Sequence, residues 1–205
     1  MSEKNKGALV LYSDIKECDI TSPVHPKERM QEIRDAKCAR VKLEKYLVWK
    51  LLGVAVKEFL NLDFDNLQFT KNDNGQWICP DFYFSLSHTD GFVCAAVSTE
   101  PIGVDAEIIR PIKEEIRFKM LTDAENEQFS LTAPSERNAY LLSCWVKKES
   151  IFKKRGGAAL LPRTIETERH FTLCESVKLG MLDYLISVCP SNKEQIIEIR
   201  YLEDL

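Results

Sequence analysis

Segments with strand-like and helical patterns follow one another along this chain in a regular order. Three strand-like runs come in close succession at residues 82–87, 92–97 and 102–108, and the turn signal Thr89-Asp90-Gly91 separates the first two. Helical spacing of apolar residues fills the stretches on either side, at residues 26–60, 112–129 and 135–155. This alternation predicts an α+β protein.

Weaker signals complete the outline. We expect further strands at residues 8–12, 67–71, 169–175, 183–189 and 195–202. Gly53 is expected to divide the first helical stretch, Ser135 to cap the last helix, and Gly156-Gly157 to end it. The strand at 102–108 is expected to complete a meander with the preceding hairpin. Because the element order repeats, we predict two similar halves, residues 1–102 and 103–205.

Composition excludes several classes of protein. The 205 residues are 44% hydrophobic and 29% charged, as in an ordinary globular protein. A net charge of −4 gives no sign of nucleic-acid binding, and no apolar run is long enough to span a bilayer. The first residues lack a signal-peptide pattern, and the seven cysteines form no C-x-x-C pair. We therefore predict a cytoplasmic protein whose cysteines are small buried apolar side chains.

Basic residues nevertheless gather locally, within residues 27–45 and again within residues 147–155. Local basic patches in an acidic protein suit a small polyanionic ligand. The alternative is a pair of solvated helix faces, and composition alone favours this alternative.

Two acidic residues stand two positions apart in the third strand-like run. Asp105 and Glu107 therefore leave the same face of a strand, while the apolar neighbours Val104 and Ala106 face the other way. Adjacent carboxylates repel unless water or a cation lies between them, and Mg²⁺ is a hard cation that carboxylates bind. Taken alone, the pair is better explained by an ordinary solvent-facing strand.

A second group lies on the last long helix. Trp145, Glu149 and Lys153 are spaced by four residues and share one face. The Glu–Lys pair alone reads as a surface ion pair, but the large aromatic residue indicates that this face looks into protein. His88, where a strand meets a turn, is either an exposed histidine or a phosphate donor.

Three motifs occur together in order: Ser87-His88, Gly103-Val-Asp-Ala-Glu107 and Trp145-x-x-Lys-Glu-Ser-x-x-Lys153. Together they resemble the Sfp-type 4′-phosphopantetheinyl transferases, and the resemblance covers most of residues 26–165. It implies the fold of that family, in which two α+β halves form an intramolecular pseudo-dimer, and hence a monomer. It also implies Mg²⁺-dependent transfer of phosphopantetheine from coenzyme A to a serine of an acyl carrier protein or peptidyl carrier protein, with release of 3′,5′-ADP.

The resemblance also implies roles for individual residues. Asp105, Glu107 and Glu149 match its Mg²⁺ ligands, Lys153 matches the lysine on the pyrophosphate, and Glu149 is the nearest candidate general base. Residues matching its coenzyme A contacts are Ser87, His88, Lys153 and, more loosely, Lys27 and Arg29.

The sequence departs from the family pattern at one point. The family often has Gly-Lys-Pro before the Ser-His strand, and this chain has Gly75-Gln76-Trp77, so a charge near the nucleotide is missing. Two alternatives therefore stay open: a non-catalytic homologue that binds coenzyme A or a carrier protein, and another Mg²⁺-dependent phosphoryl-transfer enzyme.

Overall fold

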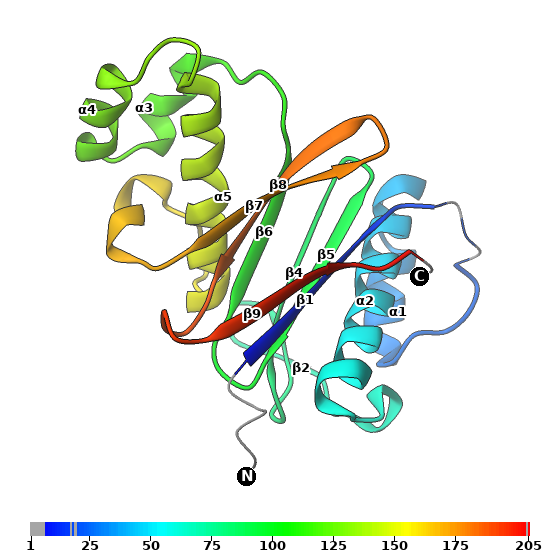
Figure 1. The fold of residues 1–205 in the computed structure, drawn as a ribbon. Coiled ribbons are helices and arrows are strands. Elements are labelled where there is room, and N and C mark those ends of the chain that lie inside the picture. The colour runs from blue at the N-terminus through cyan, green and yellow to red at the C-terminus, as the bar shows by residue number, and fades with distance from the viewer. Residues whose placement is uncertain (1–6, 17, 19, 204) are drawn as a thin grey trace.

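Two β-sheets pack face to face, and one long helix covers the outer face of each (Figure 1). The computed structural model describes residues 7–16, 18, 20–203 and 205. The first sheet has the order β4-β5-β1-β9, with bounds Tyr83–Thr89, Phe92–Ser98, Gly7–Asp14 and Ile196–Tyr201. The second has the order β6-β8-β7, with bounds Gly103–Ile108, Leu182–Cys189 and Leu173–Leu179.

Two long helices cover the sheets, and the other helices are short. The longest are α2, Ala39–Leu60, on the first sheet and α5, Arg137–Arg155, on the second (Figure 1). The shorter helices are α1, Lys27–Arg34, α3, Arg117–Met120, and α4, Asp123–Leu131. Short 3₁₀ turns occupy Phe64–Asn66, Glu114–Ile116, Pro162–Thr164 and Thr167–Arg169. A small two-stranded sheet pairs β2, Thr70–Lys71, with β3, Trp77–Ile78.

Strand β5 shows how the layers are held together. All seven of its side chains are buried, as in a strand covered on both faces. Val93, Ala95 and Val97 pack in the core under α2, whereas the alternate residues Cys94 and Ala96 pack between the sheets. The layers therefore follow the sequence helix, sheet, sheet, helix. The α+β class predicted from the sequence is confirmed.

Three local predictions are wrong. Gly53 does not divide the first helical stretch; it lies inside α2, and the break falls between Arg34 and Ala39. Ser135 is not the cap of α5, because the N-cap position belongs to Glu136. The stretch at 112–129 is not continuous, because Thr122 and Glu125 form a capping box that starts α4. At Gly53, burial of the surrounding α2 side chains outweighs the weak helix propensity of glycine.

The connection between strands also differs from expectation. Strand β6 does not join the β4–β5 hairpin as a meander; it pairs antiparallel with β8 in the second sheet. Strand β9 returns to the first sheet, where it runs parallel to β1. The first sheet thus combines strands from before residue 103 with one from the end of the chain. The division at residue 102 stays a prediction.

A buried ion pair holds the loop after α5. Lys148 is completely buried, and its ammonium lies 2.6 Å from a carboxylate oxygen of Glu125 and 2.9 Å from the carbonyl oxygen of Pro162. Lys148 therefore does not contribute to a basic surface, although the sequence groups it with such residues. Of the seven cysteines, only Cys94, Cys144 and Cys189 are buried, so the prediction of burial holds for three. None of the described helices combines the length and apolar character that crossing a bilayer requires.

Candidate active site

The candidate site lies where the two sheets meet. Strands β4 and β6 are edge strands of different sheets and run side by side. Along β6, Val104 and Ala106 turn into the core between the sheets, so Asp105 and Glu107 turn toward α5. Asp105 is only 5% exposed, and Glu107 is half-buried. The alternation expected from the sequence therefore places both carboxylates on one face.

Helix α5 brings the second group to this face. Lys153 places its ammonium nitrogen 2.7 Å from Oδ1 of Asp105 and 3.2 Å from Oγ of Ser87. Glu149 lies one turn earlier on α5 and is close enough to interact electrostatically with Asp105, Glu107 and Lys153. The Glu149–Lys153 pair is thus part of a cluster with the acidic strand, and not an isolated surface pair.

Glycine at position 103 permits this approach. A Cβ atom on Gly103 would lie 1.9 Å from the carbonyl oxygen of Ser150 and 2.7 Å from the backbone nitrogen of Lys154. No other residue fits there, because real Cβ contacts essentially never fall below 3.0 Å. The backbone of α5 therefore rests directly on β6, next to Glu149.

The carboxylates disturb one another. Burial raises the pKa of Glu107, repulsion from Asp105 raises it further, and hydrogen bonds from Thr89 and Trp145 offset part of the effect. Burial and repulsion from Asp105 likewise raise the pKa of Glu149, against the attraction of Lys153. Negative charge is thus concentrated beyond what Lys153 alone neutralises.

The donor chemistry of this cluster fits a hard divalent cation. Oδ2 of Asp105 is buried and has no hydrogen-bond partner, a costly arrangement that a bound cation would relieve. Within the part of the chain that the structure describes, no three His, Cys, Asp or Glu side chains are gathered closely enough to hold a metal ion. Lys153 instead provides the positive charge beside Asp105.

A cavity of about 400 Å³ opens on the Lys153 side of the cluster. Arg29, Gln76 and Trp77 line it together with Lys153. Arg29 is only 7% exposed, and its guanidinium lies 4.8 Å from the ring centre of Trp49. The structure thus brings Arg29 and Lys153 to one cavity. Lys27 is exposed at the start of α1 and does not line it.

His88 lies on the α2 side of β4, and its Nδ1 is 3.2 Å from Oε2 of Glu44. Glu44 is nearly buried and also accepts a hydrogen bond from Nε of Arg40 at 2.8 Å. Burial lowers the pKa of His88, while Glu44 acts in the opposite direction and Lys153 adds to the lowering. Glu44 therefore fixes the imidazole orientation with Nε2 turned away from it.

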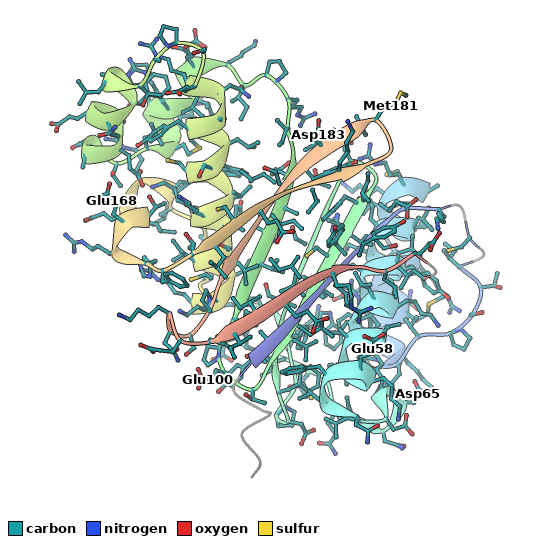
Figure 2. The ribbon with its side chains drawn as sticks, viewed as in Figure 1. Glu58, Asp65, Glu100, Glu168, Met181 and Asp183 are labelled. Atoms are coloured by element: carbon teal, nitrogen blue, oxygen red, sulfur yellow. The ribbon has the colours of Figure 1, made fainter. Side chains whose placement is uncertain are left out.

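A second cavity, of about 240 Å³, lies on the opposite side of the carboxylates. Its lining includes Glu107, Trp145, Ile112 and Arg110. Helix α5 lines both cavities, with Lys153 at the first and Trp145 at the second. Glu149 lies between these two residues on α5, so the two cavities flank the acidic cluster. A larger cavity, of about 500 Å³, lies apart from this chemistry beside α2, with Glu58 and Asp65 at its border (Figure 2).

Sequence reasoning missed three residues that shape the site: Glu44, Thr89 and Gly103. Thr89 donates a hydrogen bond to Oε2 of Glu107 at 3.1 Å. A signal was present for it, because Ser85, Ser87 and Thr89 place hydroxyls at every second position of one strand. Glu44 carried no signal, since its contact with His88 joins residues from distant elements.

Comparisons with known proteins agree with the geometry. A family model described as the 4′-phosphopantetheinyl transferase superfamily matches residues 101–188, which include the acidic strand and α5. The 4′-phosphopantetheinyl transferase ffp of Bacillus subtilis is 27% identical over 74% of this chain and 76% of its own length. Sfp of Bacillus subtilis strain 168 is 29% identical over 55% of this chain, and psf-1 of Bacillus pumilus is 33% identical over 52%. The matched regions span about half the length of these last two relatives, 51% and 47%.

Proposed function

Because the chain belongs to the Sfp-type family of the 4′-phosphopantetheinyl transferase superfamily, we propose that it transfers the phosphopantetheine arm of coenzyme A to a serine of an acyl or peptidyl carrier protein. One observation carries the proposal: β6 and α5 bring Asp105, Glu149 and Lys153 together between two cavities. Such a cluster suits a pyrophosphate, which needs cations at its centre and room on both sides.

Binding follows from the charges along the first cavity. Arg29, Lys153 and His88 would hold the phosphates of the nucleotide, and Trp77 offers an aromatic surface in the same cavity. Gln76 lines this cavity and would offer its side-chain amide where the family often has a lysine. Phosphate binding requires Lys153 to share its protons between Asp105 and the ligand, because it now donates to Asp105.

Asp105, Glu107 and Glu149 are the residues that would hold Mg²⁺. The ion, when bound, offsets negative charge on the pyrophosphate. In the transfer, the carrier serine Oγ bonds to the phosphorus that bears pantetheine, and the bond from that phosphorus to the bridging oxygen of 3′,5′-ADP breaks. Glu149 would take the serine proton on its carboxylate, and its raised pKa favours that proton. Lys153 would stabilise charge on the departing ADP.

The same geometry supports a monomer as the active form, since one chain supplies both strands and both helices around the cluster. A cytoplasmic location suits a substrate such as coenzyme A.

Mass spectrometry of an apo carrier protein tests the activity. The protein with coenzyme A and Mg²⁺ should add one phosphopantetheine to the carrier serine, and Glu149→Gln and Asp105→Ala should add none while staying folded by circular dichroism. Full modification of the carrier protein by either variant would contradict the proposed active site. Binding of coenzyme A without any transfer would favour the non-catalytic homologue, and phosphate-bond cleavage without an acceptor would favour another phosphoryl-transfer enzyme.

A further inference from the structure

Strand β4 carries three hydroxyl residues at alternate positions, Ser85, Ser87 and Thr89, which we call the hydroxyl stripe. They share one face of β4, and Phe84 and Leu86 on the other face pack into the core under α2. A run of polar side chains facing a second strand is unusual in a buried sheet, where apolar contacts are the rule.

The stripe replaces main-chain pairing between β4 and β6. Oγ of Ser85 accepts the backbone N–H of Val104 at 2.9 Å, and Oγ of Ser87 accepts that of Ala106 at 3.2 Å. Both N–H groups belong to fully buried residues, and β6 uses its other edge to pair with β8. Without the serines these donors would lack partners, which a buried backbone group rarely tolerates.

The same hydroxyls hold the acidic side chains. Ser87 donates its single proton to Oδ1 of Asp105 at 2.8 Å, while its oxygen accepts from Ala106 and from Lys153. One donor and two acceptor positions are thereby all in use. Thr89 donates to Glu107 in the same way. Oδ1 of Asp105 is therefore fixed by Ser87 and Lys153, and Oδ2 is the oxygen left unpartnered.

We propose that the hydroxyl stripe sets the position of the acidic strand, and that Ser87 and Thr89 are positioning residues that restrain the carboxylates of Asp105 and Glu107, two of the three residues that would hold the cation. This rests on the proposed function, and it gives Thr89 and Ser87, which the resemblance places among the coenzyme A contacts, a role that does not require contact with the substrate. Ser85 fixes the backbone of β6 but touches neither carboxylate. A variant at Ser85 therefore tests how the strand is held in place, separately from how the carboxylate side chains are oriented.

Amide hydrogen exchange of the metal-free protein tests whether the serines of β4 hold the backbone of β6. In Ser85→Ala, exchange at Val104 should quicken about tenfold or more, and in Ser87→Ala exchange at Ala106 should do so, because each loses the acceptor of one buried N–H. Unchanged exchange at both amides would overturn the stripe. This readout does not depend on transfer, so it can fail while the proposed function stands.

Binding of Mn²⁺ as a probe cation, measured by calorimetry, tests whether the stripe orients the carboxylates of Asp105 and Glu107. Ser87→Ala should weaken Mn²⁺ by about 10- to 100-fold, as expected when an outer hydrogen bond to a ligand is lost. Ser85→Ala should weaken it less, and Ser87→Thr, which keeps a hydroxyl, should recover most of the loss. Equal losses in Ser85→Ala and Ser87→Ala would mean that the stripe only stabilises the strand.

Thr89→Val covers the case in which Ser87→Ala does not fold. Valine keeps the shape of threonine at a half-buried position and removes only the hydrogen bond to Glu107. Mn²⁺ affinity should fall by about tenfold while the urea midpoint changes little. Wild-type affinity in Thr89→Val would contradict the positioning role at this end of the stripe.

Discussion

Replacing Gly103 with alanine should separate α5 from β6 and disable the site while the remaining fold persists. The new Cβ would start 1.9 Å from the carbonyl oxygen of Ser150, and an ordinary contact begins at 3.4 Å, so helix and strand must part by about 1.5 Å. The obstacle is helix backbone, which cannot swing aside as a flexible side chain does. If α5 retreats by that amount, the separation of Lys153 and Asp105 grows from 2.7 Å to about 4.2 Å.

Two magnitudes follow from this displacement. Overpacking of this kind costs about 1–3 kcal/mol of folding free energy, so the urea midpoint of Gly103→Ala should fall. A misplacement of about 1 Å at a reaction centre costs on the order of 100-fold in rate. Carrier labelling by mass spectrometry, under conditions where the variant is folded, should therefore slow by about that factor.

Gly53→Ala is the matched control. Its Cβ would lie 3.5 Å from the ring of Phe64, an ordinary contact. Because Gly53 lies inside α2, alanine there should stabilise the protein by about 0.5–1 kcal/mol and leave labelling unchanged. If Gly103→Ala kept wild-type stability and a wild-type labelling rate, the close contact of α5 with β6 could not be what sets the geometry of the site.

Two further predictions concern ionisable pairs away from the carboxylate cluster. Burial alone would raise the pKa of Glu125, but Lys148, the Thr122 backbone and Thr167 hold that pKa below its usual value. The Glu125–Lys148 pair therefore stabilises the folded state above about pH 4.5, and this stabilisation is lost as the pH falls through the lowered pKa. Glu125→Gln should cost about 3–5 kcal/mol at neutral pH by leaving Lys148 unpaired, and should flatten the acid-side loss of the urea midpoint; an unaltered midpoint would contradict it. Glu44→Gln should lower the pKa of His88 further, because Glu44 now acts to raise it. Coenzyme A affinity measured by calorimetry should then decline at lower pH than in the wild type, and an identical pH profile would exclude His88 as a charged contact.

Residue spacing predicts which side chains share a face of one element, and the family resemblance implies that two such faces meet. A period of two put Asp105 and Glu107 on one face of β6, and a period of four put Glu149 and Lys153 on one face of α5. These are local properties of a strand and a helix, so sequence carries them directly. The contact of Lys153 with Asp105 then required only that the two faces come together.

What sequence reasoning missed depends on contacts between distant segments. Strand β6 follows the β4–β5 hairpin closely, and short connections usually join neighbours in one sheet, so a meander was the natural prediction. Pairing with β8, about 80 residues later, wins because it buries both faces of β6. Glu44 escaped notice for a similar reason: its partner His88 lies on another element.

Because β9 returns to the first sheet, the first 102 residues do not contain a complete sheet. A fragment ending at residue 102 would keep β5 but lack β9, so β1 would become an edge strand whose unpaired backbone donors and acceptors can pair with other chains. Such a fragment should therefore aggregate. Grafting residues 195–202 onto this fragment through a flexible linker should restore the missing neighbour of β1 and reduce aggregation.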